Sequence, residues 1–250
     1  MAGLTLDGIA GKQLGARWAS PRVVYWRQMT SALDAVHELA TQGAPSGTVA
    51  LCDEQTAGRG RAGRPWHSPA GGVWLAMLFR PPVAPAGPFA LRAGLVTADV
   101  VDALLGAHRA QVKWPNDVML GERKLAGILC ETRWQGETLQ WLALGIGLNV
   151  ANPIPSEVAA TAVALQEEKP GVQRLDVLDR LVPALWPLAA ITGPLTEREC
   201  VAFAERDWLR GRQLREPLFG RAAGIRPDGA LLVETDVGAT PVREGRVALA

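Results

Sequence analysis

Cysteine is scarce in this 250-residue sequence, and its scarcity excludes two kinds of architecture. The three cysteines, Cys52, Cys130 and Cys200, are odd in number and widely separated. They support neither a disulfide framework nor a Cys-x-x-Cys metal site, so we interpret them as small core residues.

Histidine is equally rare, because His37, His67 and His108 are the only three in the chain. They are scattered without the spacing that metal ligands show. We expect structural roles for His37 and His108, whereas His67 lies near the polar loop described below.

Long apolar runs and an excess of one charge are also missing. The apolar runs are interrupted within about ten residues, short of the roughly 20 that cross a bilayer, and no signal segment is evident. The net charge of +1 argues against a chain that binds polyanions as a whole. We expect a cytoplasmic globular protein, and its 48% hydrophobic residues can fill one large domain or a large and a small one.

The most distinctive segment that is present runs from Asp53 to Trp66. It combines three arginines with three glycines, in the order Gly58, Arg59, Gly60, Arg61, Gly63 and Arg64. Glycine lets a backbone approach a ligand closely, and guanidinium offers a planar charged fork that suits phosphate or carboxylate. The segment predicts an anion-binding loop, and a solvated basic turn is the alternative.

The spacing Gly58-x-Gly60-x-x-Gly63 also matches the dinucleotide-binding fingerprint, but its context does not. That fingerprint requires a helix directly after the glycines, and the proline-rich segment 65–72 cannot begin one. A kinase glycine loop would need valine at Pro65 and later His-Arg-Asp and Asp-Phe-Gly motifs, which are absent. The Gly-x4-Gly-Lys-Ser/Thr phosphate loop is absent as well.

Hydrophobic periodicity predicts a mixture of helices and strands. A helix begins near Thr30-Ser31, with Asp34 in its first turn, and ends at Gly43. The other predicted helices are 89–105, 175–190 and 196–209, and the predicted strands are 48–53, 73–79, 111–114, 118–120, 124–132 and 138–147. The strands imply an antiparallel or mixed sheet, and the short strands from Arg212 onward imply a small all-β module.

A second polar cluster surrounds Pro115. Lys113, Trp114, Asn116 and Asp117 interrupt an apolar run there, and a hairpin would return Lys124 toward Lys113 and Asp117. Asp117 could bind magnesium and Lys113 a phosphate, although a lysine at the start of a strand, such as Lys124, is often only an edge charge.

Two further features of this region suit a ligand. The segment from Gly145 to Asn149 ends a strand with two glycines and an amide, which favours close ligand approach. Trp66 and Trp114 would offer exposed indoles for stacking.

Taken together, Gly-Arg-Gly-Arg-x-Gly-Arg-x-Trp, Lys-Trp-Pro-Asn-Asp, Lys-x-Ala-Gly-Ile-Leu-x-Glu and Gly-x-Gly-x-Asn-Val resemble the catalytic domain of biotin protein ligases. The resemblance covers residues 23–150, and the tail around residues 219–233 is similar to the family's SH3-like C-terminal domain. It implies an α+β fold, a mixed sheet backed by helices like that of class II aminoacyl-tRNA synthetases. The implied domains are residues 1–208, catalytic, and residues 209–250, SH3-like.

The resemblance also implies an activity. In such ligases the biotin carboxylate attacks the α-phosphorus of Mg-ATP, which releases pyrophosphate and forms biotinyl-5'-AMP. A lysine of a biotin carboxyl carrier domain then attacks this mixed anhydride. ATP and Mg²⁺ are the implied co-substrate and metal, and the carrier domain is the implied partner.

Residue roles follow from the same resemblance. The implied catalytic residues are Lys124, Arg59 and Asp117, and Asp117 is also the implied Mg²⁺ ligand. The implied biotin-binding residues are Thr30, Ser31, Gln55, Gly58, Arg59, Gly60, Arg61, Lys124, Gly127 and Gly145. The implied ATP-binding residues are Arg61, Arg64, Trp66, Lys113, Asn116, Asp117, Lys124 and Asn149.

One departure from the family concerns the acid. Met29 stands where the family commonly has a serine that binds the ureido ring of biotin. A lost hydrogen bond to a buried group costs about 1–3 kcal/mol. Weaker biotin binding, or a related acid such as lipoate, therefore stays open. A non-catalytic biotin-binding relative is a separate alternative.

A second departure concerns DNA. Some members of the family carry an N-terminal winged helix-turn-helix, and only about twenty residues precede the strand expected at Val23 here. That length is too short for a DNA-binding domain, so we expect no repressor role. A membrane partner is not expected either, and a homodimer is one oligomeric state that the resemblance allows.

Overall fold

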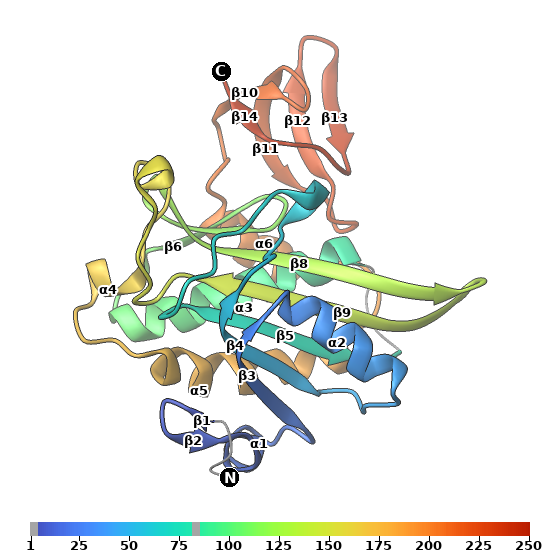
Figure 1. Cartoon of the computed structure of the whole chain (residues 1–250). Coiled ribbons are helices and arrows are strands. Elements are labelled where there is room, and N and C mark those ends of the chain that lie inside the picture. The colour runs from blue at the N-terminus through green and yellow to red at the C-terminus, as the bar shows by residue number, and fades with distance from the viewer. Residues whose placement is uncertain (1–4, 82–85) are drawn as a thin grey trace.

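The computed structural model describes residues 5–81 and 86–250, and a seven-stranded sheet forms its centre (Figure 1). The strand order is β3-β4-β5-β9-β8-β7-β6, in which β3 and β4 are parallel and all other neighbours are antiparallel. The strands are β3 (Val23–Met29), β4 (Val49–Gln55), β5 (Val73–Phe79), β6 (Ala110–Lys113), β7 (Asp117–Leu120), β8 (Arg123–Gln135) and β9 (Thr138–Leu148). The predicted mixed sheet is confirmed.

Helices cover both faces of this sheet, which explains why every residue of β5 is buried. On one face, α2 (Ala32–Thr41) packs over small side chains such as Ala50, Ala76 and Ala143. On the other, α3 (Ala86–Leu105) and α5 (Arg174–Leu185) pack over larger ones such as Leu75 and Met77. Alternate residues of one strand point to opposite faces, so the sequence of β5 sets both layers.

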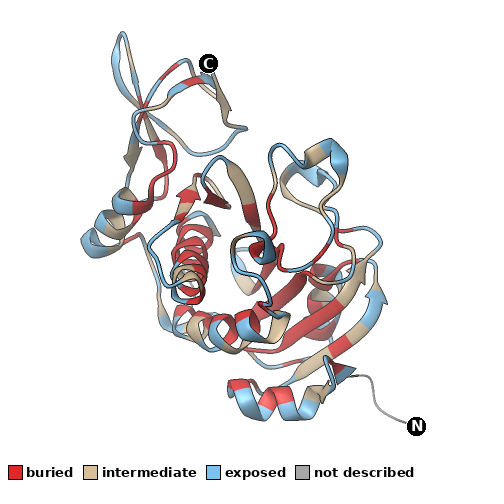
Figure 2. Ribbon diagram, turned by 90° about the vertical axis from the view of Figure 1, so that its left-hand side faces the viewer, coloured by how far each residue is buried: buried red, intermediate tan, exposed pale blue. Residues whose placement is uncertain are grey.

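The helices differ in detail from their predicted ranges. Helix α3 begins three residues earlier than predicted, and its middle lies in the buried interior (Figure 2). Helix α5 ends at Leu185, where the 3-10 turn Trp186–Ala190 takes over, so the predicted range 175–190 merged two elements. Helix α6 (Glu197–Arg206) follows the N-cap Thr196, and the short α4 spans Leu165–Glu168.

An N-terminal unit that the sequence did not predict packs at the foot of the molecule in Figure 1. It comprises β1 (Thr5–Leu6), β2 (Ile9–Ala10) and α1 (Gly11–Trp18). Leu14 and Trp18 of α1 are buried in the same core as α5, and the Trp18 indole N–H donates to Asp179 at 2.8 Å.

A separate five-stranded antiparallel sheet lies at the opposite end, above the main sheet in Figure 1. Its order is β13-β12-β11-β10-β14, with β10 (Gln213–Glu216), β11 (Gly220–Ile225), β12 (Leu231–Thr235), β13 (Gly238–Val242) and β14 (Ala248–Leu249). This agrees with the predicted small all-β module. Within the described ranges, no helix is long and apolar enough to span a membrane.

Trp114 joins the two sheets, which corrects the prediction that its indole is exposed for stacking. Its side chain is only 2% exposed, and its Nε1 donates to the carbonyl of Gly229 at 2.9 Å. A strand end that faces a second sheet has no free indole face to offer a ligand.

Candidate active site

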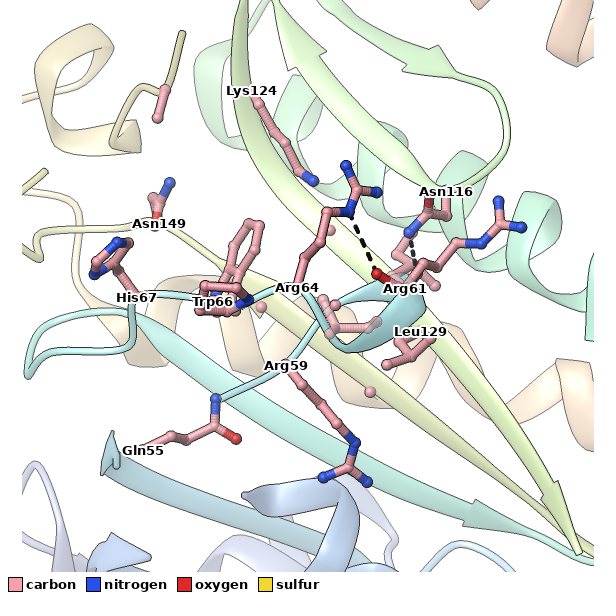
Figure 3. A pocket seen from close by; sticks show the side chains of 18 of the residues that line it. Gln55, Arg59, Arg61, Arg64, Trp66, His67, Asn116, Lys124, Leu129 and Asn149 are labelled. Carbon is pink, nitrogen blue, oxygen red and sulfur yellow. Dashed lines mark hydrogen bonds between the residues drawn. The ribbon is translucent and has the colours of Figure 1, made fainter. Parts of the chain in front are cut away.

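A cavity of about 260 Å³ lies between the arginine-glycine loop, which is the part of the segment Asp53–Trp66 that follows β4, and the neighbouring strands β8 and β9 (Figure 3). The N-terminus of α2 contributes Ser31, Ala32 and Leu33 to its wall, and the segment after β9 contributes Asn152, Ile154, Pro155, Val158, Thr161 and Ala162. Twelve predicted site residues line it: Ser31, Gln55, Arg59, Gly60, Arg61, Arg64, Trp66, Asn116, Lys124, Gly127, Gly145 and Asn149.

Backbone hydrogen bonds shape the loop that covers the cavity. The Trp66 N–H donates to the Gly58 carbonyl and the Gly60 N–H to the Arg64 carbonyl, both at 2.8 Å. Between them, Arg61–Gly63 makes a 3-10 turn. A Cβ on Gly58 would stand 2.6 Å from the Trp66 carbonyl, so this position requires glycine for closure of the loop.

The three arginines of the loop have different surroundings. Arg59 points away from Arg64 and Lys124 (Figure 3), and its guanidinium binds two carboxylates described below. Arg61 is half-buried, and burial together with the nearby charge of Arg64 lowers its pKa. A cation with a lowered pKa gains from an anionic neighbour, so Arg61 is suited to a phosphate or carboxylate ligand.

Trp66 occupies the space that two glycines leave open. A Cβ on Gly147 would stand 2.5 Å from the Trp66 Nε1, and one on Gly127 would stand 3.1 Å from its Cζ3. Gly145 and Gly147 were predicted to allow close ligand approach, and this is wrong for Gly147, because the Trp66 indole fills the space beside it. A Cβ on Gly145 would likewise meet Leu33, at 2.9 Å.

Lys124 extends into the cavity from the start of β8. Its Nζ lies 2.6 Å from Asp117 Oδ1 and 4.8 Å from the centroid of the Trp66 ring. The predicted return of the hairpin toward Asp117 is thus confirmed. One lysine in contact with a carboxylate and an indole is a fixed cation, which can stabilise negative charge that develops beside it.

Uncharged polar groups complete the wall. Gln55 accepts from the Ala32 N–H at 2.8 Å and so caps α2, whose N-cap residue Ser31 makes no capping hydrogen bond with its own side chain. Asn116 donates to the Ile128 carbonyl at 2.7 Å, and the buried Asn149 accepts from Asn152 at 3.1 Å. These bonds fix the amides, so they can orient a ligand without rearrangement.

Four predicted site residues lie outside the cavity lining: Thr30, Gly58, Lys113 and Asp117. Thr30 is exposed, and Gly58 borders an adjoining hollow behind Trp66. The Lys113 Nζ lies 4.7 Å from the centroid of the Trp208 ring, and burial lowers the pKa of this lysine. Met29 does not line the cavity either, and its side chain packs against the cluster that contains Ala32 and Leu33.

Glu131, which contacts the loop through Arg59, was not predicted as a site residue. Its carboxylate binds Arg59 in a bidentate pair, with both N–O distances at 3.0 Å, and accepts from His37 Nε2 at 2.9 Å. These hydrogen bonds lower the pKa of Glu131 to about 2, and the hydrogen bond from His37 has the largest effect. Two signals pointed to it: Glu131 ends the motif Lys-x-Ala-Gly-Ile-Leu-x-Glu, and it alternates with Gly127 and Leu129, which places all three on one face of β8.

The described residues include no preformed metal centre, because no group of three or more His, Cys, Asp and Glu side chains could hold an ion. Asp117 is a single carboxylate already paired with Lys124. It suits an ion that arrives with phosphate ligands of its own, since Mg²⁺ is commonly held by one or two carboxylates plus substrate phosphates.

Comparison with known proteins places this geometry in context. The sequence model of the Biotin/lipoate A/B protein ligase family matches residues 24–149. The bifunctional ligase/repressor BirA of Bacillus subtilis is 31% identical over 235 residues, which cover 86% of this chain and 70% of that protein. A biotin–[acetyl-CoA-carboxylase] ligase of Paracoccus denitrificans is 35% identical over 208 residues, which cover 75% of this chain and 84% of that protein.

A solved structure extends the likeness to nearly the whole chain. The biotin protein ligase of Aquifex aeolicus in complex with biotin and ATP superposes with a TM-score of 0.76 at 25% identity. The match covers 92% of this chain and 99% of that one.

Proposed function

Because this chain belongs to the Biotin/lipoate A/B protein ligase family, we propose that it is a biotin protein ligase that joins biotin to a carrier protein at the expense of ATP. The observation that carries this proposal is the division of the cavity. Arg61, Arg64 and Lys124 line the cavity together with Trp66, and the Lys124 ammonium lies over its indole. The residues that α2 contributes carry no charge, and Arg59, which also lines the cavity, is neutralised by Asp34 and Glu131. Such a cavity can hold an acid at one end and a nucleotide at the other.

The reaction must bring two anions together, so the cations of the cavity are needed to offset the repulsion between them. Attack of the biotin carboxylate on the α-phosphorus of ATP concentrates negative charge between the two substrates. Lys124 lines the cavity beside Asp117 and the Trp66 ring, where it can contact both the carboxylate and the α-phosphate, and Arg61 can contact the resulting anhydride. Arg64 would neutralise ATP phosphates, and Trp66 would provide the surface for adenine.

The remaining predicted residues divide between the substrates. We assign Ser31, Gln55, Gly58, Gly60, Gly127 and Gly145 to the biotin end, with Arg59 in the loop above it and Thr30 beside Ser31. We assign Asn116 and Asn149 to the nucleotide end, and Lys113 acts there through charge alone, because its ammonium faces Trp208. Asp117 would contact the Mg²⁺ of Mg-ATP and accept a proton from the carrier lysine, which must be neutral to attack.

The proposed partner is a biotin carboxyl carrier domain, and the proposed place of action is the cytoplasm. The proposal includes no DNA-binding role and divides the chain after residue 208. A homodimer is one oligomeric state compatible with the proposal, and analytical ultracentrifugation would detect it.

One assay tests the function. Purified protein is incubated with Mg-ATP, a biotin carrier domain and labelled biotin, and parallel samples contain labelled lipoate. We expect label on the carrier with biotin and none with lipoate. An unlabelled carrier in both samples would remove the ligase proposal, and label from lipoate alone would change the acid.

A further inference from the structure

Arg59 is the one arginine of the loop whose guanidinium is fully occupied by protein carboxylates. Its Nε and Nη2 bind the two oxygens of Glu131 at 3.0 Å each, and its Nη1 lies 2.7 Å from Asp34 Oδ1. One positive charge therefore faces two negative ones. The two carboxylates neutralise the positive charge of Arg59, so its guanidinium attracts a substrate anion less strongly than the guanidinium groups of Arg61 and Arg64 do.

A second set of contacts holds Glu131 in place. His37 Nε2 lies 2.9 Å from Glu131 Oε2, and the Trp141 indole N–H donates to His37 Nδ1 at 2.9 Å. An indole nitrogen is only a donor, so Nδ1 is the acceptor and the ring proton sits on Nε2, where it is donated to Glu131. The hydrogen bonds thus converge on the Glu131 carboxylate, which accepts from His37 of α2 on one side and from Arg59 of the loop on the other.

The elements explain why these residues meet. Asp34 and His37 are three residues apart on α2 and share one helix face. Glu131 follows Gly127 and Leu129 on the face of β8 that borders the cavity. Arg59 precedes the part of the loop that carries Arg61 and Arg64, so its ion pairs tie that part to two rigid elements.

We propose that Glu131 and His37 are positioning residues that hold the Arg59 side chain against α2 and thereby keep the arginine-glycine loop closed over the cavity. This inference rests on the proposed function, because closure matters for an acyl-adenylate that water would hydrolyse. Arg59 then acts on the reaction through loop position, and its guanidinium is not the cation that meets the substrate.

The test uses Glu131→Gln, which keeps the shape of the side chain and removes its charge. Its matched control is Glu199→Gln, because Glu199 also holds an arginine, Arg92, by two hydrogen bonds, at 2.6 and 2.9 Å, outside the cavity. The two carboxylates have similar exposure, 29% and 22%. A general loss of stability would therefore appear in both variants.

Amide hydrogen exchange of the ligand-free protein gives the first readout. We expect the Gly60 and Trp66 amides to exchange about tenfold faster in Glu131→Gln and at the parent rate in Glu199→Gln. Unchanged exchange in Glu131→Gln would overturn the proposal. This readout needs no activity, so it stands apart from the labelling assay, whose failure in the parent protein would overturn only the proposed function.

Steady-state kinetics of the full chain give the second readout. We expect Glu131→Gln to raise the KM for biotin about tenfold and to release more AMP per labelled carrier, with kcat for adenylation within about twofold of the parent. A merely structural loss would lower kcat and leave KM and the AMP ratio unchanged. Arg59→Gln combined with Glu131→Gln should be no worse than Arg59→Gln alone.

Two outcomes would contradict the role given to Arg59. One is a loss of kcat of about a hundredfold or more in Arg59→Gln with parent behaviour in Glu131→Gln, since the guanidinium would then act on the substrate directly. The other is parent KM in Asp34→Asn, the variant to use if Glu131→Gln does not fold, because Asp34 supplies the other carboxylate.

Discussion

Replacing Lys124 with methionine removes one positive charge from the cavity and keeps a side chain of similar length. The ammonium touches Asp117 at 2.6 Å and lies 4.8 Å from the Trp66 ring centroid, so its position is set on two sides. Its side chain is 30% exposed, which leaves it reachable by a substrate. We expect Lys124→Met to impair adenylation far more than it impairs folding.

The size of the effect has two parts. Loss of one preorganised group that stabilises charge in a transition state typically lowers kcat by about 10²–10³, equivalent to about 2.7–4 kcal/mol. The variant also leaves the Asp117 carboxylate, 21% exposed, without its cation and near the incoming phosphates. The double variant Lys124→Met/Asp117→Asn removes this second part, so we expect it to recover part of the loss.

The assay is biotin-dependent release of pyrophosphate from ATP, measured without carrier so that only the first step is followed. Lys169→Met is the matched control, because Lys169 is also held by a hydrogen bond, from Nζ to the Leu104 carbonyl, and lies outside the cavity lining. A Lys124→Met protein that keeps more than about a third of the parent kcat/KM would refute the reasoning, since ΔΔG‡ would then be below about 0.7 kcal/mol.

Other substitutions probe the wall, the pH dependence and the join between the sheets. Gly147→Ala should raise the KM for ATP about tenfold in a folded protein, because its Cβ displaces the Trp66 indole, and a parent KM would show that the indole does not serve the nucleotide. Burial raises the pKa of Asp207 to about 6, so the native state binds its proton more tightly than the unfolded state and Asp207 costs stability as the pH rises through 6. Asp207→Asn should therefore raise the melting temperature at about pH 8 and leave it nearly unchanged near pH 4, and the reverse order would contradict this sign. Trp114→Phe removes the hydrogen bond to Gly229 and should destabilise the protein by about 1–3 kcal/mol in urea unfolding, whereas no change would mean that the bond does not join the sheets.

Local composition was enough to predict an anion-binding loop, because the residue types alone, three arginines among three glycines, indicate that chemistry. The contact between Lys124 and Asp117 was also predictable from local sequence, because the two residues lie on adjacent strands that a short turn joins. The division of labour among the arginines was not. It depends on Glu131 and on α2, which are distant in sequence and meet the loop only once the sheet forms.

The N-terminal unit was not predicted, because its elements are too short to show a hydrophobic periodicity. Strands β1 and β2 have two residues each, and α1 has eight, so no periodicity could develop. Their stability comes from tertiary contacts such as the burial of Trp18, which local propensity does not report. Trp114 was misjudged for the opposite reason: its polar neighbours suggested exposure, while the C-terminal sheet covers it.

The glycines of β8 and β9 link the three sequence motifs into one packing unit. Gly127 and Gly147 lack the side chains that would collide with Trp66, and Trp66 is the last residue of the arginine-glycine loop. Lys124 lies against the same indole. A change at either glycine therefore acts on the loop and on the lysine together, although neither glycine has a side chain that could bind a substrate. The role that we propose for Gly127 and Gly147 in ligand binding is therefore indirect, through the tryptophan for which they leave room.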